Sequence, residues 1–315
     1  MLVFGPVPSR RLGRSMGVNN IPPKICTYSC VYCQLGRTLK LQNVRQAFYK
    51  PEEVLREVQD KIEKARAAGE SVDYLTFVPD GEPTLDIHLG AEIALLKSLG
   101  IKLAVITNSS LLWHEEVRAA LSQADWVSLK MDAVLEEVWH RVDRPHGSLR
   151  LPAILAGALE FAKTFEGQLV TETMLVEGVN DGVAAIEAVS DFLARLKPQT
   201  AYLAIPTRPP AEAWVRSPDE EVINRDYQIL RREVAHVEYL VGYEGNAFAL
   251  TGDAADDLLS ITSVHPMRED AVHEFLGRAE ADWAVVRDLV AGGQLVETTY
   301  EGRKFYVRKL NSRKG

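Results

Sequence analysis

ICTYSCVYCQLGR, residues 25–37, contains all three cysteines of this 315-residue chain, Cys26, Cys30 and Cys33. An odd number of thiols argues against a disulfide framework, because one thiol would be left over. A structural zinc site needs four ligands, and the next candidate, His88, lies far along the chain. Three thiolates in one short loop instead suit an iron–sulfur cluster in which one iron has no protein ligand. That iron would be open to another molecule.

The composition narrows the class of protein. With 46% hydrophobic residues, the chain can form one large core and a small extra domain. Its net charge of −8 argues against a surface that coats nucleic acid generally, although it is compatible with a local basic patch. No apolar run is long enough to span a membrane. The N-terminal sequence lacks the apolar core of a signal peptide. We therefore expect a cytoplasmic protein with no membrane partner, in a compartment where thiols stay reduced.

Short β-rich runs alternate with amphipathic stretches through most of the chain. One such stretch begins at Pro51 and closes on Gly69, as helices often do. The pattern predicts strands near residues 15–20, 72–79, 101–108, 125–132, 169–176 and 200–207, separated by helices near 51–69, 87–99, 114–123, 149–165 and 182–196. Alternating strands and helices imply parallel βαβ units. Both a doubly wound sheet and a complete or partial barrel satisfy this pattern.

Polar residues follow several of the predicted strands. In either fold, the loops that leave the carboxyl ends of parallel strands build the active site. The residues at these positions are Asp80, Gly81 and Glu82 after the second strand, Asn108 after the third, and Lys130 and Asp132 at the end of the fourth. This recurrence predicts one shared site.

The C-terminal part of the chain has a different pattern. Two helical stretches, 267–279 and 282–293, precede two alternating runs that meet at Glu301-Gly302, which predicts a hairpin. Helix, helix and hairpin outline a small winged-helix-like domain over 258–315, after a larger domain over 1–250. Its role could equally be packing or dimer contact. Six basic residues of the hairpin and tail either contact nucleic acid or are simply solvated: Arg303, Lys304, Arg308, Lys309, Arg313 and Lys314.

The Cys-x3-Cys-x2-Cys spacing, with an aromatic residue before Cys33, resembles the radical S-adenosylmethionine (SAM) superfamily. The resemblance implies that the three thiolates hold a [4Fe-4S] cluster, whose fourth iron is chelated by SAM. One electron then cleaves the sulfonium bond and gives a 5′-deoxyadenosyl radical. It also implies an α/β fold, a partial (β/α)6 TIM-type barrel, and a one-electron donor such as flavodoxin or ferredoxin.

PDGEPTL, residues 79–85, resembles the second signature of the superfamily, usually Gly-Gly-Glu-Pro. Asp80 stands where the first glycine is common. The resemblance implies that Gly81, Glu82 and Pro83 belong to the cofactor site. Gly81 would allow close approach of the backbone, and Glu82 would accept a hydrogen bond from the methionine ammonium.

The resemblance also implies cofactor contacts for four further residues, each of which has a simpler structural alternative. Tyr32 would cover the cluster or contact adenine, or it is an ordinary packed aromatic. Asn108 matches the position that reaches the ribose or methionine end, or it is a turn residue. Lys130 and Asp132 resemble a strand end of glycyl-radical activating enzymes that touches the methionine carboxylate, or they form an internal ion pair. Arg208 could meet an anionic substrate, or be solvated.

GPVPSRRLGRSMG, residues 5–17, together with GEPTL, resembles a group of small iron–sulfur oxidoreductases related to wyosine synthases. Those synthases rebuild a guanine of transfer RNA with pyruvate, a lysine and a second cluster. Here one cluster uses all three cysteines, which weakens the assignment.

Three functions remain open. The first is a radical enzyme acting on a small molecule or on RNA, including tRNA. The second is an activase that makes a glycyl radical on a partner protein. The third is a non-catalytic iron–sulfur redox regulator, against which the Gly-Glu-Pro motif argues because a sensor needs no SAM site. The sequence identifies neither the catalytic residues nor the substrate.

Overall fold

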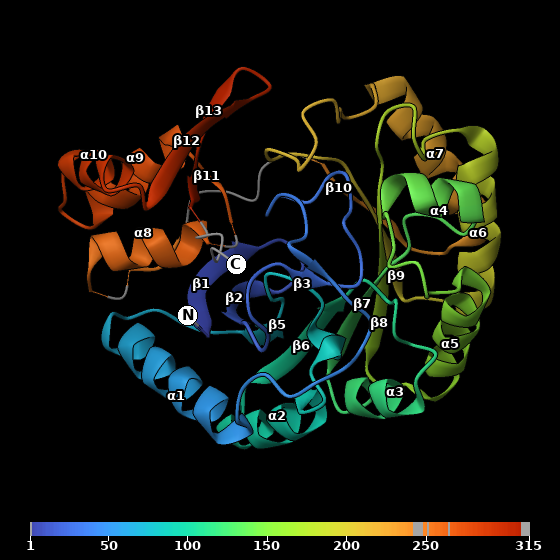
Figure 1. The fold of residues 1–315 in the computed structure, drawn as a ribbon, viewed down its shortest axis with the longest axis horizontal. Helices are drawn as coiled ribbons and strands as arrows, with labels where there is room; N and C mark the ends of the chain where they lie inside the picture. The colour runs from blue at the N-terminus through green and yellow to red at the C-terminus, as the bar shows by residue number, and fades with distance from the viewer. Residues whose placement is uncertain (1, 242–247, 251, 264, 310–315) are drawn as a thin grey trace.

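The computed structural model describes residues 2–241, 248–250, 252–263 and 265–309. An eight-stranded sheet, in the order β1-β2-β5-β6-β7-β8-β9-β10, curls into a half-barrel (Figure 1). Neighbouring strands from β2 to β10 are parallel, and β1 is antiparallel to β2. The strands are β1 (Val3–Ser9), β2 (Gly13–Val18), β5 (Tyr74–Phe77), β6 (Lys102–Thr107), β7 (Trp126–Lys130), β8 (Gln168–Met174), β9 (Thr200–Ala204) and β10 (Val237–Leu240).

The strands form where the sequence has short apolar, β-rich runs. In β6, Leu103, Ala104 and Val105 are consecutive and fully buried, as expected for a parallel strand covered on both faces. The six strands predicted from the alternation are confirmed as β2 and β5 to β9. Of the two alternatives left open by periodicity, the partial barrel is the one observed. Strands β1 and β10 were not predicted.

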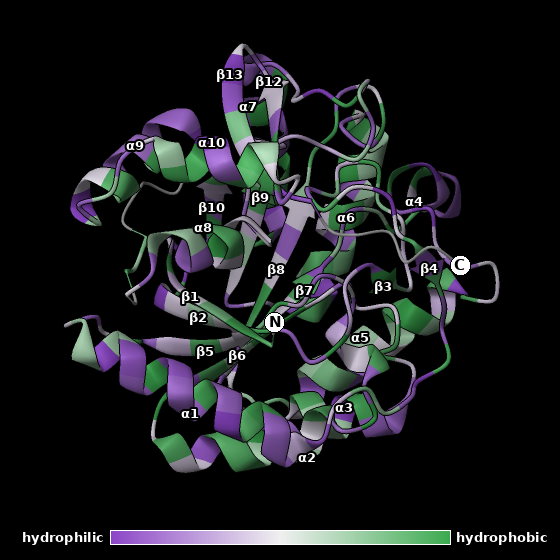
Figure 2. Cartoon of the chain, turned by 60° about the vertical axis from the view of Figure 1, so that its left-hand side comes forward, coloured by the Kyte–Doolittle hydropathy of each residue, from purple (hydrophilic) through white to green (hydrophobic). Residues whose placement is uncertain are grey.

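Helices cover the outer face of the sheet (Figure 1). They are α1 (Pro51–Ala67), α2 (Leu89–Leu96), α3 (Glu115–Leu121), α4 (Glu136–Val142), α5 (Leu151–Thr164), α6 (Val183–Leu196) and α7 (Glu220–Glu233). In α1, Val54, Val58, Ile62 and Ala65 recur at helical spacing and are buried. Figure 2 shows the hydrophilic residues of α1 alternating with this apolar stripe. The predicted helices are confirmed, whereas α4 and α7 are additional.

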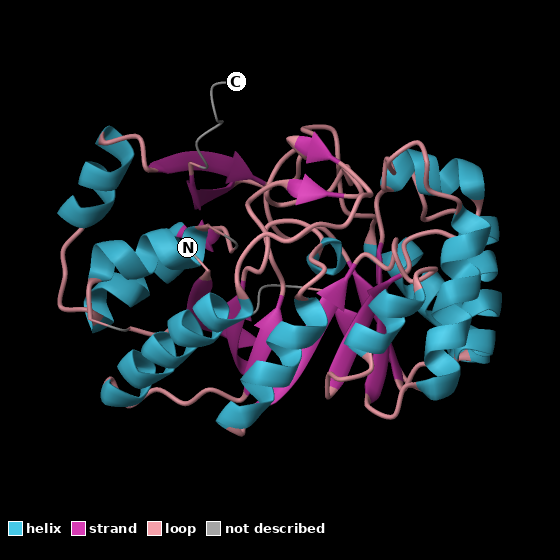
Figure 3. Ribbon diagram, turned by 60° about the horizontal axis from the view of Figure 1, so that its bottom comes forward, coloured by secondary structure: helices cyan, strands magenta, loops and turns pink. Residues whose placement is uncertain are grey.

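The loops that leave the strands gather on one side of the sheet (Figure 3). The cysteine loop lies among them and contains a two-stranded ribbon, β3 (Ile25–Cys26) paired with β4 (Lys40–Leu41). This arrangement brings the cysteines to the same side as the predicted strand-end residues. No helix within the described ranges is long and apolar enough to cross a membrane.

The C-terminal elements form a second, smaller layer beside β1 (Figure 1). They are α8 (Ala254–Thr262), β11 (Met267–Arg268), α9 (Glu269–Arg278), α10 (Ala284–Ala291), β12 (Leu295–Tyr300) and β13 (Arg303–Arg308). The three strands form a sheet in the order β11-β13-β12. The two predicted helices and the hairpin are observed, while α8 and β11 are additional. The winged-helix assignment and the boundaries 1–250 and 258–315 stay predictions.

The C-terminal elements have their own hydrophobic cluster, which includes Phe248, Phe275 and Tyr306. Val7 of β1 packs against this cluster. Lys61 of α1 forms an ion pair with Asp257 of α8 at 3.4 Å. The C-terminal elements are therefore attached to the barrel by apolar and charged contacts. Of the predicted basic tail, Arg313 and Lys314 lie outside the described residues.

Candidate cofactor site

A cavity of about 320 Å³ lies where the strand-end loops meet the cysteine loop. Cys26, Cys30 and Cys33 all line it, together with Gly81 and Lys130. The prediction of one shared site is therefore supported by the position of these side chains. Other lining residues come from the β1–β2 turn, from β8 and from the loop after β9: Arg10, Arg11, Glu172, Met174, Ile205, Pro206 and Arg208.

The three thiols are half-buried and free. Burial, together with the nearby charge of Glu82, raises the pKa of Cys26 to about 12. Burial also raises the pKa of Cys30 and that of Cys33. The thiols are therefore protonated at neutral pH when nothing is bound to them. Because a metal binds the thiolate, loading this loop with metal must release protons.

The three cysteines give the cavity a set of sulfur donors. In the part of the chain that the structure describes, no three histidine, cysteine or acidic side chains converge closely enough to hold one metal ion. In an iron–sulfur cluster each thiolate binds a different iron, so its ligands stand further apart. Three sulfur donors around one cavity fit such a cluster.

Gly81 is the point at which the second motif touches the cysteine loop. A Cβ added to Gly81 would lie 1.9 Å from the carbonyl oxygen of Ile25. No side chain fits there. The amide of Glu82 donates to the same carbonyl at 3.2 Å. Pro83 is buried and begins a short 3-10 turn, and its carbonyl accepts from Asn20 Nδ2 at 3.2 Å.

Glu82 is buried behind the cavity wall. Its Oε1 accepts hydrogen bonds from Thr84 Oγ1 and Thr107 Oγ1, both at 2.6 Å, and its Oε2 accepts from the Asn108 amide at 2.7 Å. Burial raises the pKa of Glu82, while these hydrogen bonds lower it. Glu82 therefore joins the ends of β5 and β6. Its contact with the methionine ammonium stays a prediction.

Replacing Glu82 by Ala should weaken SAM binding by on the order of 1–3 kcal/mol, because it removes the acceptor for Thr107 and Asn108 and the acceptor predicted for the methionine ammonium. Anaerobic titration calorimetry on the cluster-loaded protein measures the effect, with Glu82→Gln as the size-matched control. If Glu82→Ala binds SAM as tightly as the parent, the motif has been misread as a cofactor motif.

Asn108 lies against the cysteine loop. Its Nδ2 donates to Thr27 Oγ1 at 2.7 Å and is 3.5 Å from Cys26 Sγ. Its Oδ1 accepts from the Ser110 amide at 3.0 Å, which is the turn role weighed as the alternative. The predicted contact with the ribose or methionine end stays a prediction.

Tyr32, Lys130 and Asp132 lie together in a buried network. Tyr32 Oη donates to Asp132 Oδ2. Lys130 Nζ lies 3.6 Å from Asp132 Oδ1, 3.0 Å from Glu172 Oε1 and 4.8 Å from the centroid of the Tyr32 ring. Arg11 Nη1 binds the other oxygen of Glu172. The internal ion pair considered for Lys130 and Asp132 is present, and Lys130 and Tyr32 also line the cavity.

The opposite charges of this network stabilise each other in the ionised form. Burial alone would lower the pKa of Lys130, but Asp132 and Glu172 raise it above the usual value. Burial alone would raise the pKa of Glu172, but Lys130 and Arg11 lower it to about 2. Both groups are therefore charged at neutral pH. Sequence reasoning missed Glu172 and Arg11, although an acid inside an apolar predicted strand was a usable signal.

Two further acids lie near the cysteines: Asp143, which the sequence did not single out, and Asp80, which it placed at the predicted site without a specific role. Asp143 follows α4, and its Oδ1 lies 3.3 Å from Cys30 Sγ. Asp80 lines the cavity and is 3% exposed, and its Oδ1 has no hydrogen-bond partner among the described residues. Burial raises the pKa of Asp80 to about 7. Asp80 thus presents a carboxyl group to the cavity that the protein only partly satisfies.

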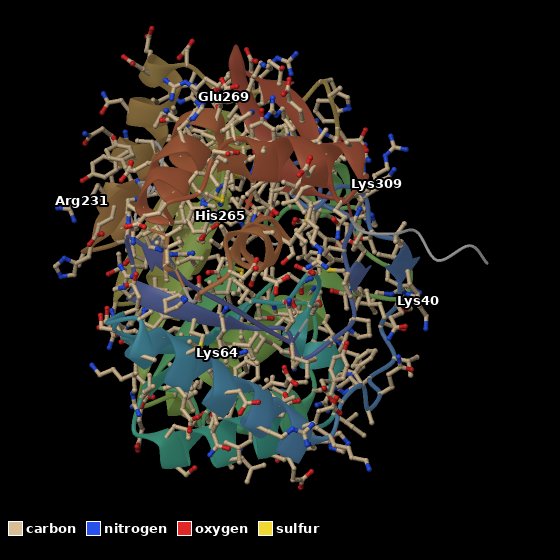
Figure 4. All side chains as sticks on the ribbon, turned by 90° about the vertical axis from the view of Figure 1, so that its left-hand side faces the viewer. Lys40, Lys64, Arg231, His265, Glu269 and Lys309 are labelled. Atoms are coloured by element: carbon tan, nitrogen blue, oxygen red, sulfur yellow. The ribbon has the colours of Figure 1, made fainter. Side chains whose placement is uncertain are left out.

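The C-terminal elements reach the wall of the cavity. Arg208 lines the cavity, donates to Gln34 Oε1 at 2.8 Å and lies 3.1 Å from His265 Nε2. Tyr300 Oη donates to the carbonyl of Pro206 at 3.3 Å. Figure 4 shows His265 where the C-terminal elements meet the barrel. The loop after β9 is therefore held from outside by the C-terminal elements.

Comparison with known proteins gives one matching family model, the Radical SAM superfamily, over residues 20–189. A UPF0026 protein from Methanocaldococcus jannaschii is 42% identical over 314 residues, covering 99% of this chain and 97% of the relative. A UPF0026 protein from Helicobacter pylori is 33% identical over 225 residues, covering 70% of this chain and 71% of the relative.

Solved structures share the fold. A radical SAM methyltransferase from Sphaerobacter thermophilus superposes with a TM-score of 0.54 at 19% identity, over 72% of this chain and 67% of the other. TYW1 with a lysine–pyruvate adduct bound superposes with a TM-score of 0.54 at 17% identity, over 70% of this chain and 74% of the other. At these identities the likeness concerns the fold alone.

Proposed function

The chain belongs to the radical SAM superfamily and is an enzyme, and we propose that Cys26, Cys30 and Cys33 hold a [4Fe-4S] cluster beside a SAM site. When bound, these groups supply a 5′-deoxyadenosyl radical through one-electron cleavage of the sulfonium bond. The observation that carries the proposal is that all three thiols line one cavity together with Asp80 and Gly81 of the second motif and Lys130 at a strand end.

The chain's own residues bind and orient the cofactor in this proposal. Gly81 lets the second motif pack against the cysteine loop, so that thiols and motif border one space. Lys130 carries a positive charge at the cavity and suits the methionine carboxylate. Asp80 offers a carboxyl oxygen that suits an ammonium or hydroxyl group. Tyr32 and Asp132 keep Lys130 in place.

The radical abstracts hydrogen from a small molecule or from RNA, which enters beside the loop after β9. The support is the position of Pro206 and Arg208 in the cavity wall, on the side where His265 and Tyr300 meet the barrel. Arg208 offers a guanidinium group to an anionic part of the substrate. The C-terminal elements then contribute to the substrate entrance by supporting this loop.

The experiment is anaerobic reconstitution of the full chain with iron and sulfide. The proposal predicts about four irons and about four sulfides per chain, as one cubane cluster requires. With dithionite as reductant, SAM should change the paramagnetic resonance spectrum of the reduced cluster. Without substrate, SAM should be slowly cleaved to 5′-deoxyadenosine and methionine. Bound zinc with no sulfide, or a cluster that leaves SAM intact, would contradict the proposal.

A further inference from the structure

The segment that follows the cysteines exposes apolar side chains. Residues 37–45, here called the outer strip, include Leu39, Leu41 and Val44, whose exposed fractions are 60%, 39% and 70%. Large aliphatic side chains that cluster at the surface of a protein commonly mark an interaction site. Strand β4, which includes Leu41, lies on the opposite side of the molecule from α8 and α9 (Figure 2).

The outer strip is also basic. It contains Arg37, Lys40 and Arg45, and no acidic residue occurs between Gln34 and Pro51. Arg37 pairs with Glu212 at 2.8 Å and Arg45 with Glu116 at 3.0 Å. Lys40 is exposed and forms no ion pair with any residue in the described ranges. A basic strip on a chain of net charge −8 favours an acidic partner at this place.

The outer strip is bonded directly to the backbone that carries the first thiol. Strand β4 pairs with β3, and Leu41 is the partner of Cys26. The amide of Gln42 donates to the Cys26 carbonyl at 3.0 Å. Just before these residues, Gly36 and Thr38 line the cavity. One short segment therefore has the thiol cavity on its inner side and solvent on its outer side.

We propose that the outer strip is the docking surface for an acidic one-electron donor protein of the flavodoxin or ferredoxin class. The inference rests on the proposed function, because the electron's destination is the cluster held by Cys26, Cys30 and Cys33. In this step the reduced donor loses one electron, the cluster gains one, and no bond forms or breaks. Docking at the strip brings the donor to the outer side of the β3–β4 ribbon, next to Cys26.

The mixture of side chains favours a protein partner over RNA. Aliphatic residues surrounded by basic ones are typical of a protein interface with an apolar centre and a polar rim. RNA binding depends on many phosphate contacts and on stacking platforms. The strip has three basic residues, which is too few for many phosphate contacts, and no aromatic residue lies within it.

The test compares the rate of cluster reduction by a protein donor with the rate of reduction by dithionite, a small chemical reductant. Purified flavodoxin, reduced to its hydroquinone, is mixed anaerobically with the cluster-loaded full chain, and cluster reduction is followed by absorbance. We expect Lys40→Glu to slow this reduction about tenfold or more at low salt and to flatten its salt dependence. Val44→Ser should slow it while leaving the salt dependence unchanged. Reduction by dithionite should be unchanged in both variants, because this small anion needs no docking surface.

Lys64→Glu is the matched control. Lys64 is an exposed lysine of α1, and Figure 4 shows it well separated from Lys40. The same charge change there should leave both reductions at the parent rates. Parent-like reduction by flavodoxin in Lys40→Glu and Val44→Ser would overturn the inference. So would loss of transfer RNA binding in Lys40→Glu with flavodoxin reduction intact. Failure of the proposed function gives a different result, because the parent protein would then cleave no SAM even with dithionite as the reductant.

Discussion

Replacing Cys26, Cys30 and Cys33 together by Ala is expected to abolish the cluster absorbance of the reconstituted protein and all cleavage of SAM. The three residues are the only cysteines of the chain, so no other thiol can take over an iron. All three line the cavity, and none is bonded in a disulfide. Absorbance, iron and sulfide analysis, and 5′-deoxyadenosine formation under dithionite measure the effect.

The loss must come from the missing ligands and not from unfolding. Ser29→Ala is the control in the same loop, because it removes a small polar group whose oxygen accepts a long hydrogen bond, 3.3 Å, from the Thr38 amide. We expect this variant to hold the cluster. Circular dichroism should show the helix content of the parent in both variants. Iron and sulfide retained by the triple variant would contradict the ligand assignment.

Much of the barrel follows from periodicity. Runs such as residues 101–108 are short, β-branched and bounded by turn residues, and each predicted run became a strand. Strand β1 was missed because Gly5, Pro6 and Pro8 interrupt its β-rich pattern. Helix α7 was missed although its signal was present: Asp219 caps it, and Ile223 and Leu230 recur on its buried face.

From the sequence, the site could be predicted only for residues that lie at the ends of predicted strands. The positions of Lys130 and Asp132 follow from the rule that the carboxyl ends of parallel strands meet. Their partners depend on register, which periodicity does not give. Lys130 lies beside Glu172 because β7 and β8 pair in that register. The contact of Asp143 with Cys30 spans 113 residues of sequence and has no local signal.

Replacing Glu172 by Ala should cause the largest loss of stability among the site variants. Its carboxylate lies between Lys130 and Arg11, and the side chains of all three are at most 14% exposed. Without it, two buried cations face each other, and Lys130 keeps Asp132 as its ion-pair partner while Arg11 loses the carboxylate that it binds. Breaking a buried ion pair in this way typically costs about 3–5 kcal/mol. Urea unfolding of the metal-free protein at neutral pH measures the loss.

The same residue predicts a pH dependence with a definite sign. The pKa of Glu172 is lowered from 4.5 to about 2 in the folded protein. Its charge therefore stabilises the fold above about 4.5, and this contribution is lost as the pH falls from about 4.5 to about 2. A pKa difference of about 2.5 corresponds to about 3 kcal/mol, which agrees with the loss expected for Glu172→Ala.

The parent and Glu172→Ala should therefore differ most in free energy of unfolding at neutral pH and converge as the pH approaches about 2. Glu160→Ala is the control: it removes an acid from the exposed Glu160–Lys163 pair of α5 and should leave the free energy of unfolding close to that of the parent, because water screens an exposed pair. A Glu172→Ala variant as stable as the parent at neutral pH would mean that Arg11 and Lys130 do not depend on this carboxylate. Lys130 would then be free to meet an anionic group in the cavity without first leaving Glu172.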